Sequence, residues 1–164
     1  KLILRGDPNN ELFIKETSKV LGYKLPLTPN TFLQKNDRAS VWLGPDEWLL
    51  NSIPDDESSL EKDLNTALTD VHHSVTNVSD SSTIIELSGP HARSVIMKGC
   101  AVDIHPRVFK PGDAFQSNLA AASVIMWQLD LIPTFNIMVR ASFASYLWEW
   151  LLDAGAEFGI QVQQ

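Results

Sequence analysis

The sequence predicts an α+β fold made of two similar units, at about residues 1–70 and 82–160, within a single domain of 164 residues. Three observations support this prediction. The segment LILRGDP at residues 2–8 is echoed by IIELSGP at residues 84–90. In both halves an apolar hairpin pattern follows this segment after the same interval, and an amphipathic helix pattern follows each hairpin. Each unit is therefore expected to run strand, helix, hairpin and helix, with antiparallel sheets.

Each half begins with an apolar strand that leads into a helix start signal. In the first half Asp7 can cap a helix whose first residue is Pro8, and in the second half Gly89 and Pro90 can fill the same roles. A glycine is expected after the last turn, because it adopts the left-handed conformation most readily. The two glycines in these positions are Gly22 and Gly99.

The hairpin patterns are ASVWLGPDEWLL at residues 39–50 and ASVIMWQLDLIPTFNIMV at residues 122–139. In the first, a four-residue turn at residues 44–47 would place Leu43 opposite Trp48. Both faces of this hairpin are apolar, so we expect it to be buried on two sides.

The amphipathic helices that close the two units have an apolar residue every three or four positions. The apolar positions are Leu60, Leu64, Ala67 and Leu68 in the first unit, and Phe143, Leu147, Trp150, Leu151, Ala154 and Phe158 in the second. A polar stretch at residues 70–82 has the composition of a connecting loop.

Composition excludes several classes of partner. The net charge of −7 and pI near 4.9 argue against a nucleic-acid or anionic-lipid surface, which requires clustered lysine and arginine. No apolar run reaches the roughly 18 residues of a membrane span. Cys100 is the only cysteine and no signal peptide opens the chain, so we expect a cytoplasmic protein.

The adjacent carboxylates Asp46 and Glu47 could form an acid/base pair between two tryptophans. Neighbouring residues in a turn rarely point at one bond, as acid/base catalysis requires. Aspartate is also favoured in turns, where water solvates its charge. We therefore expect a solvated turn and no catalytic residue here.

The other candidate chemistry is weak. Asp103 and His105 lie near Cys100, but their spacing matches no zinc motif. The neighbouring histidines His72 and His73 point to opposite faces if the chain is extended, so they cannot chelate together. The glycines are single and lack phosphate-loop spacing. We expect no catalytic, cofactor-binding or metal-binding residue in this chain.

The last helix carries a second apolar face, centred on Trp148 and Leu152 with the small residues Ser145 and Ala156 beside it. This face is either covered by the rest of the domain or open as a docking surface around an aromatic anchor. An open face would also make self-association of the isolated chain plausible. The residues predicted to contact a partner are Trp148, Leu152 and Arg107.

Four segments of the chain are distinctive: DRASVWLGPDEWLL (37–50), VSDSSTIIELSGPHARSVIMKGC (78–100), DIHPRVFKPGD (103–113) and RASFASYLWEWLLDAGAEFG (140–159). Together they closely resemble the gamma subunit family of heterotetrameric sarcosine oxidase. The resemblance covers nearly the whole chain, and its broader relatives are the folate-binding aminomethyltransferases of glycine cleavage. These share the helix start at Gly89, Pro90 and Ala92, and their fold agrees with the duplicated α+β layout.

The resemblance implies a small, non-catalytic subunit of an oxidoreductase that converts sarcosine and oxygen to glycine and hydrogen peroxide. The one-carbon unit leaves as formaldehyde or methylene-tetrahydrofolate. The family's alpha subunit, the expected main partner, carries NAD and a folate site, the beta subunit carries FAD, and FMN lies between them. A delta subunit completes the heterotetramer. No cofactor is expected in this chain, whose role would be structural.

The sequence departs from the folate transferases before the first hairpin. Their glycine-rich segment with paired aspartates is replaced by LQKNDRASVW, in which Asp37 is the nearest acid, and Ser82 stands where relatives often have arginine. The alternative function, a free-standing tetrahydrofolate-binding one-carbon transfer protein, is supported only by the shared fold.

Overall fold

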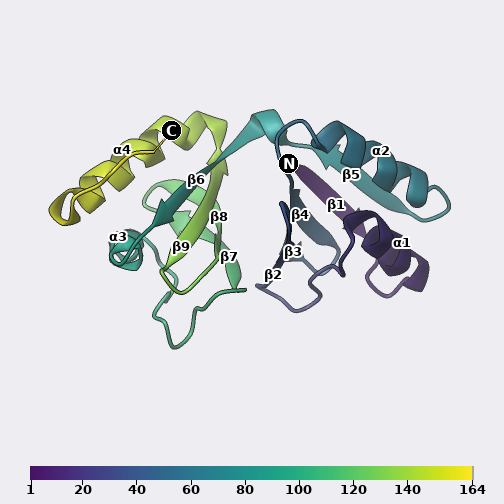
Figure 1. Cartoon of the computed structure of the whole chain (residues 1–164), viewed down its shortest axis with the longest axis horizontal. Helices are drawn as coiled ribbons and strands as arrows, with labels where there is room; N and C mark the ends of the chain where they lie inside the picture. The colour runs from purple at the N-terminus through teal and green to yellow at the C-terminus, as the bar shows by residue number, and fades with distance from the viewer. Residues whose placement is uncertain (164) are drawn as a thin grey trace. The chain divides into compact units, whose positions relative to one another are not determined.

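The computed structural model describes residues 1–163, which divide into two compact units (Figure 1). Unit 1 is Lys1–Ser79 and unit 2 begins at Asp80. Both are mixed α/β units with antiparallel sheets, as predicted. Within residues 1–163, no helix has the length and apolar character needed to cross a membrane.

Unit 1 contains one five-stranded sheet with the strand order β2-β3-β4-β1-β5 and two helices. Its elements are β1 (Leu2–Gly6), α1 (Glu11–Leu21), β2 (Phe32–Lys35), β3 (Arg38–Gly44), β4 (Glu47–Asn51), α2 (Glu57–Ala67) and β5 (His73–Asn77). The core lies between the helices and one face of the sheet, and includes Leu2, Leu4, Phe13, Trp48, Leu60, Leu64 and Leu68. The helix pattern predicted around Leu60 and Leu64 is therefore confirmed.

Helix α1 begins three residues later than predicted. Asn10 is its N-cap and accepts hydrogen bonds from the backbone N–H groups of Leu12 and Phe13. Asp7 instead accepts from the backbone of Asn9 at 2.9 Å and closes a separate turn. The predicted end at Gly22 is confirmed, with a φ of 80° in the left-handed region.

The hairpin of β3 and β4 is confirmed, but its predicted register is wrong. Trp42 pairs with Trp48 and Gly44 with Glu47, because the register shifts at a β-bulge between Trp42 and Gly44. The turn therefore contains only Pro45 and Asp46 between the paired ends. Burial on both faces is as predicted, since Trp48 and Leu49, which point to opposite faces, are both fully buried.

Unit 2 contains one four-stranded sheet with the strand order β6-β9-β8-β7 and two helices. Its elements are β6 (Ser82–Ser88), α3 (Ala92–Met97), β7 (Ala114–Leu119), β8 (Ala122–Gln128), β9 (Thr134–Arg140) and α4 (Ala144–Gly155). The hairpin predicted at residues 122–139 is β8 paired with β9.

Three strands were not predicted: β2, β5 and β7. Strand β5 lies inside the stretch expected to be a loop, and it pairs with β1 from Leu2↔Asn77 to Gly6↔His73. Edge strands need few apolar residues, because one side of the strand and much of its face contact water. Most of β2 and β5 is exposed or half-buried, so their polar sequences carry no clear alternation.

Helix α3 is shorter than expected, with His91 at its N-cap position in place of Gly89. The prediction that Gly99 adopts the left-handed conformation is also wrong, because Gly99 is not among the described glycines with a positive φ. Glycine is required there for a different reason. A Cβ on Gly99 would lie 2.5 Å from Cζ2 of Trp150 and 3.1 Å from the backbone nitrogen of Ala120.

Helix α4 covers one face of the unit 2 sheet with the stripe that the sequence predicted. Leu147, Leu151 and Ala154 are buried in the core cluster, and Trp150 and Phe158 pack against its margin. Phe143 and Phe158 lie outside the helix, in the short 3-10 turns before and after it, and Phe143 is 42% exposed.

Candidate functional site

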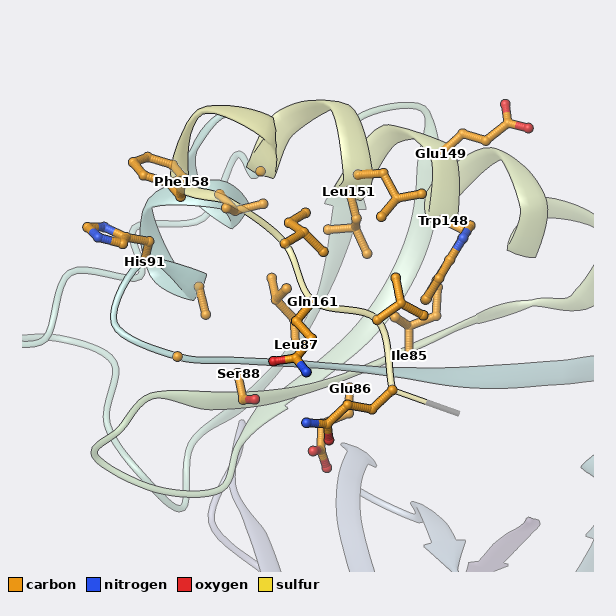
Figure 2. Close-up of a pocket in the computed structure, with 18 of the residues that line it drawn as sticks. Ile85, Glu86, Leu87, Ser88, His91, Trp148, Glu149, Leu151, Phe158 and Gln161 are labelled. Atoms are coloured by element: carbon orange, nitrogen blue, oxygen red, sulfur yellow. The ribbon is translucent and has the colours of Figure 1, made fainter.

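A groove in unit 2 lies between strand β6, helix α4 and the C-terminal segment, residues 159–163 (Figure 2). It encloses about 1040 Å³. Strand β6 contributes every residue from Thr83 to Ser88, and α4 contributes Ser145, Trp148, Glu149, Leu151 and Leu152. The N-terminal end of α3 closes one end with His91 and Ala92.

The surface of the groove is mainly apolar. Ile85 and Leu87 alternate along β6, so both point to the side that α4 covers, and they pack against the core cluster. Trp148 and Leu152, one helical turn apart, complete the apolar surface from α4. Trp148 remains 39% exposed, although it is a large apolar side chain.

Among residues 1–163, two charged side chains line the groove, and both are acidic. Glu86 projects from β6 and Glu149 from α4, and each is exposed. No lysine or arginine is among the lining residues. Glu86 alternates with Ile85 and Leu87 and therefore projects from the other face of β6, and Glu149 points away from the groove (Figure 2), so the groove itself offers mainly apolar contact.

At one end of the groove, the side chains of His91 and Lys98 pack against the ring of Phe158. The rings of His91 and Phe158 lie 4.5 Å apart and nearly parallel, with an interplanar angle of 8°. The ammonium group of Lys98 lies 5.1 Å from the centre of the same ring and forms an ion pair with Glu157. These contacts fix the point from which the C-terminal segment enters the groove.

The loop that contains Ile104 is held by a partly buried polar network that sequence analysis missed. The guanidinium of Arg93 donates to the backbone oxygen of Ile104 and, at 2.8 Å, to Oε1 of Gln128. Gln128 is 1% exposed and donates its own amide to the backbone oxygen of Asp130 at 2.6 Å. Burial lowers the pKa of Arg93. Nothing in the spacing of these residues indicates that they meet.

The carboxylates Asp46 and Glu47 lie in unit 1 and do not line the groove. Asp46 sits at the exposed hairpin turn, where Oδ2 is 3.1 Å from Nη2 of Arg5, and both side chains are more than half exposed. Asp46 therefore occupies a solvated turn, as expected, whereas Glu47 is the half-buried first residue of β4 and pairs with Gly44.

The loop that contains Arg107 satisfies its polar groups locally. Asp103 accepts from the backbone of His105 at 2.9 Å, and Nδ1 of His105 accepts from the backbone of Arg107 at 3.2 Å. Arg107 is exposed but does not line the groove that contains Trp148 and Leu152. The structure thus places two of the three predicted contact residues together and the third elsewhere.

The remaining candidates also have local roles. His73 bonds through its two ring nitrogens to the backbone oxygen of Val71 at 2.7 Å and to Asn65 at 3.0 Å. Cys100 is half-buried, and burial raises the pKa of its thiol. Across residues 1–163, no three histidine, cysteine, aspartate or glutamate side chains are grouped to hold a metal ion.

Comparison with known proteins gives consistent matches. The profile of the sarcosine oxidase, gamma subunit family matches residues 5–157. The chain is 38% identical to sarcosine oxidase subunit gamma of Corynebacterium sp. (strain P-1) over 120 residues. The aligned region covers 73% of this chain and 58% of that protein. The corresponding subunit of Corynebacterium sp. (strain U-96) is 36% identical, with coverage of 73% and 57%. The match thus spans less than two thirds of the length of these relatives.

A solved structure is also similar. It is the heterotetrameric sarcosine oxidase from Corynebacterium sp. U-96 in complex with pyrrole 2-carboxylate, in which one chain gives a TM-score of 0.85 at 31% sequence identity. The similarity covers 99% of this chain and 82% of that chain.

Proposed function

This chain belongs to the sarcosine oxidase gamma subunit family, and from that premise we propose that it is a non-catalytic small subunit of a flavin-dependent heterotetrameric sarcosine oxidase. The complex would oxidise sarcosine with oxygen to glycine and hydrogen peroxide, and would release formaldehyde or methylene-tetrahydrofolate. The role of this chain would be assembly. The matches do not favour a free-standing folate-binding protein.

The observation that carries the proposal is the partly open apolar groove of unit 2. Trp148 is 39% exposed beside the half-buried Leu152, on a helix whose opposite face is fully used by the core. A tryptophan in such a position gains free energy when a partner removes it from water. Arg107, exposed in its loop, is proposed as a second and separate contact.

The partner that we propose for this surface is the alpha subunit, with beta and delta subunits elsewhere in the complex. We place FAD, FMN, NAD and tetrahydrofolate in the partner subunits and none in this chain. The sequence supports this division, because its glycines lack the spacing of a dinucleotide or phosphate loop. A cytoplasmic location is proposed with the complex.

We also propose that the two units arose by duplication and share the fold of the folate-binding aminomethyltransferases. The sheets support this idea. In unit 1 the order is β2-β3-β4-β1, with β5 added at the edge, and in unit 2 the corresponding strands run β7-β8-β9-β6.

The test is native purification of the tagged chain from its own cells. We expect a yellow complex far larger than 18.3 kDa that consumes oxygen when sarcosine is added. A colourless particle of one or two chains would contradict the proposal. Calorimetric titration of the isolated chain with tetrahydrofolate tests the alternative, for which saturable heat would be required.

A further inference from the structure

The three most exposed large apolar side chains of residues 1–163 lie on two loops of unit 2. They are Leu131, Ile132 and Val108, which are 86%, 68% and 60% exposed. Leu131 and Ile132 form the tip of the connection between β8 and β9, and Val108 lies in the loop before β7. We call residues 103–113 and 129–133 together the loop surface. Single exposed apolar residues are common on proteins, but the two loops that carry these three are joined to one another.

Both loops are hydrogen-bonded to Gln128, the last residue of β8. The backbone N–H of Gln128 donates to the backbone oxygen of Asp113 at 3.1 Å, and the backbone oxygen of Gln128 accepts from Gly112 at 3.2 Å. The side-chain amide of Gln128 donates to the backbone oxygen of Asp130 at 2.6 Å. The exposed apolar side chains therefore belong to one continuous surface, which marks a protein interaction site more strongly than scattered residues do.

The tip itself has a fixed backbone. Oδ1 of Asp130 accepts from the backbone N–H groups of Ile132 and Thr134, both at 2.9 Å, and the N–H of Leu129 donates to the backbone oxygen of Thr134 at 2.8 Å. The carboxylate of Asp130 is thus turned towards the backbone, and Leu131 and Ile132 are the exposed side chains of the tip. Because folding has already ordered this backbone, a partner that binds the tip does not have to order it.

A projecting tip with two aliphatic side chains is complementary to an apolar recess in another protein. A lipid surface fits less well, because the chain has a net charge of −7 and residues 129–133 contain no lysine or arginine to contact lipid headgroups. The solved structure to which the chain is similar is that of a heterotetrameric enzyme. A different subunit is therefore a better candidate for the recess than a second copy of this chain.

We propose that the loop surface docks into an apolar recess of a partner subunit, with Leu131 and Ile132 inserted and Val108 at the edge of the contact. Gln128 is a positioning residue for this surface, because it bonds to both loops and is itself only 1% exposed. The inference rests on the proposed function and adds a surface of unit 2 apart from the groove. Arg107, next to Val108 in the chain, belongs to the same surface.

The test is titration of the partner subunits with labelled chain, followed by native mass measurement and fluorescence anisotropy. The double variant Leu131→Ser/Ile132→Ser changes two side chains that already face water, so the isolated variant should keep its urea midpoint. The matched control is Leu27→Ser/Ile53→Ser, which changes two aliphatic side chains of unit 1 that are 53% and 51% exposed.

We expect the Leu131→Ser/Ile132→Ser variant to bind the partner subunits about 100-fold more weakly than the unmodified chain. The magnitude follows because covering one exposed aliphatic side chain contributes about tenfold or more to affinity. The control should bind within about threefold of the unmodified chain.

Gln128→Leu tests the positioning role. It keeps the apolar tip but removes the donor to Asp130 and the acceptor of Arg93. We expect the folded variant to bind about tenfold more weakly, and hydrogen exchange to become faster at the amides of Ile132 and Thr134, because the tip must then be ordered on binding. An unchanged affinity of the folded variant would show that Gln128 only stabilises the chain.

Equal binding by the Leu131→Ser/Ile132→Ser variant and the unmodified chain would overturn the inference, and a native flavin complex would then leave the proposed function standing. If the native chain yields no flavin complex, the proposed function fails and the inference fails with it. Two other results would replace the proposed occupant. A dimer in sedimentation that the double variant loses would identify a second copy, and flotation with phosphatidylcholine and phosphatidylglycerol vesicles that the double variant loses would identify a lipid surface.

Discussion

Replacing Trp148 by aspartate tests the docking role of the groove most directly. The change removes the aromatic anchor of α4 and puts a carboxylate beside the apolar side chains of the groove. Trp148 is 39% exposed, so the new carboxylate can remain in water in the isolated chain. We expect the isolated variant to fold, with an unfolding free energy within about 2 kcal/mol of the unmodified chain.

The effect on assembly can be estimated from the exposed area. A tryptophan side chain can bury up to about 250 Å², and 39% of that leaves about 100 Å² for a partner to cover. At about 25 cal/mol per Å², the loss is about 2.5 kcal/mol, or roughly 60-fold in the dissociation constant. Burying an unpaired carboxylate adds to this loss, so 60-fold is a lower bound.

The assay is titration of the partner subunits with labelled chain, followed by native mass measurement. Leu12→Asp is the matched control, because Leu12 is 44% exposed on α1 and lies in unit 1, outside the groove. We expect the control to assemble normally. Assembly of Trp148→Asp within threefold of the unmodified chain would remove Trp148 from the interface and refute the area argument.

Three further predictions concern the stability of the chain. Gly99→Ala should lower the free energy of unfolding in urea by about 1–3 kcal/mol, because the added Cβ collides with the indole of Trp150. Gly44→Ala is the control, because a Cβ there would lie 3.7 Å from Cβ of Glu47, and it should change the free energy of unfolding by less than about 1 kcal/mol. Equal midpoints for these two variants would contradict this reason. Gln128→Leu should cost about 1–3 kcal/mol, because Arg93 loses a buried acceptor, and Gln128→Glu should restore part of the loss. Because burial raises the pKa of the Cys100 thiol, the thiol stabilises the folded chain at pH values below the ordinary thiol pKa. This stabilisation is lost as the pH rises through the pKa that the thiol has in the folded chain. Alkylation at pH 8 should therefore be slower in the folded chain than in urea, and equal rates would show that burial does not protect the thiol.

The sequence predicted the elements that have strong apolar periodicity. The hairpins at residues 39–50 and 122–139 are apolar runs on either side of a turn, and the stripe from Leu147 to Ala154 repeats every three or four positions, because a buried face constrains every residue on it. Helix starts were less accurate. Several residues near Asp7 can serve as caps, and local sequence does not determine which of them begins the helix.

The hairpin register shows a second limit. Moving the pairing by one residue normally exchanges the buried and exposed faces, so the apolar pattern fixes the register. In β3 and β4 both faces are apolar, and the pattern therefore fits either register. The bulge between Trp42 and Gly44 decides between them, and it depends on how the strands pack in the sheet.

The sequence by itself determined the antiparallel α+β class, the family resemblance and the apolar character of Trp148 and Leu152, because each depends on residues close together in the chain. Only the tertiary structure decided what surrounds those two side chains. Strand β6 and residues 159–163 reach the same groove from distant parts of unit 2, and Gly99 is needed because Trp150 folds against it. These contacts arise when the sheet and helices pack, so local patterns carry no record of them.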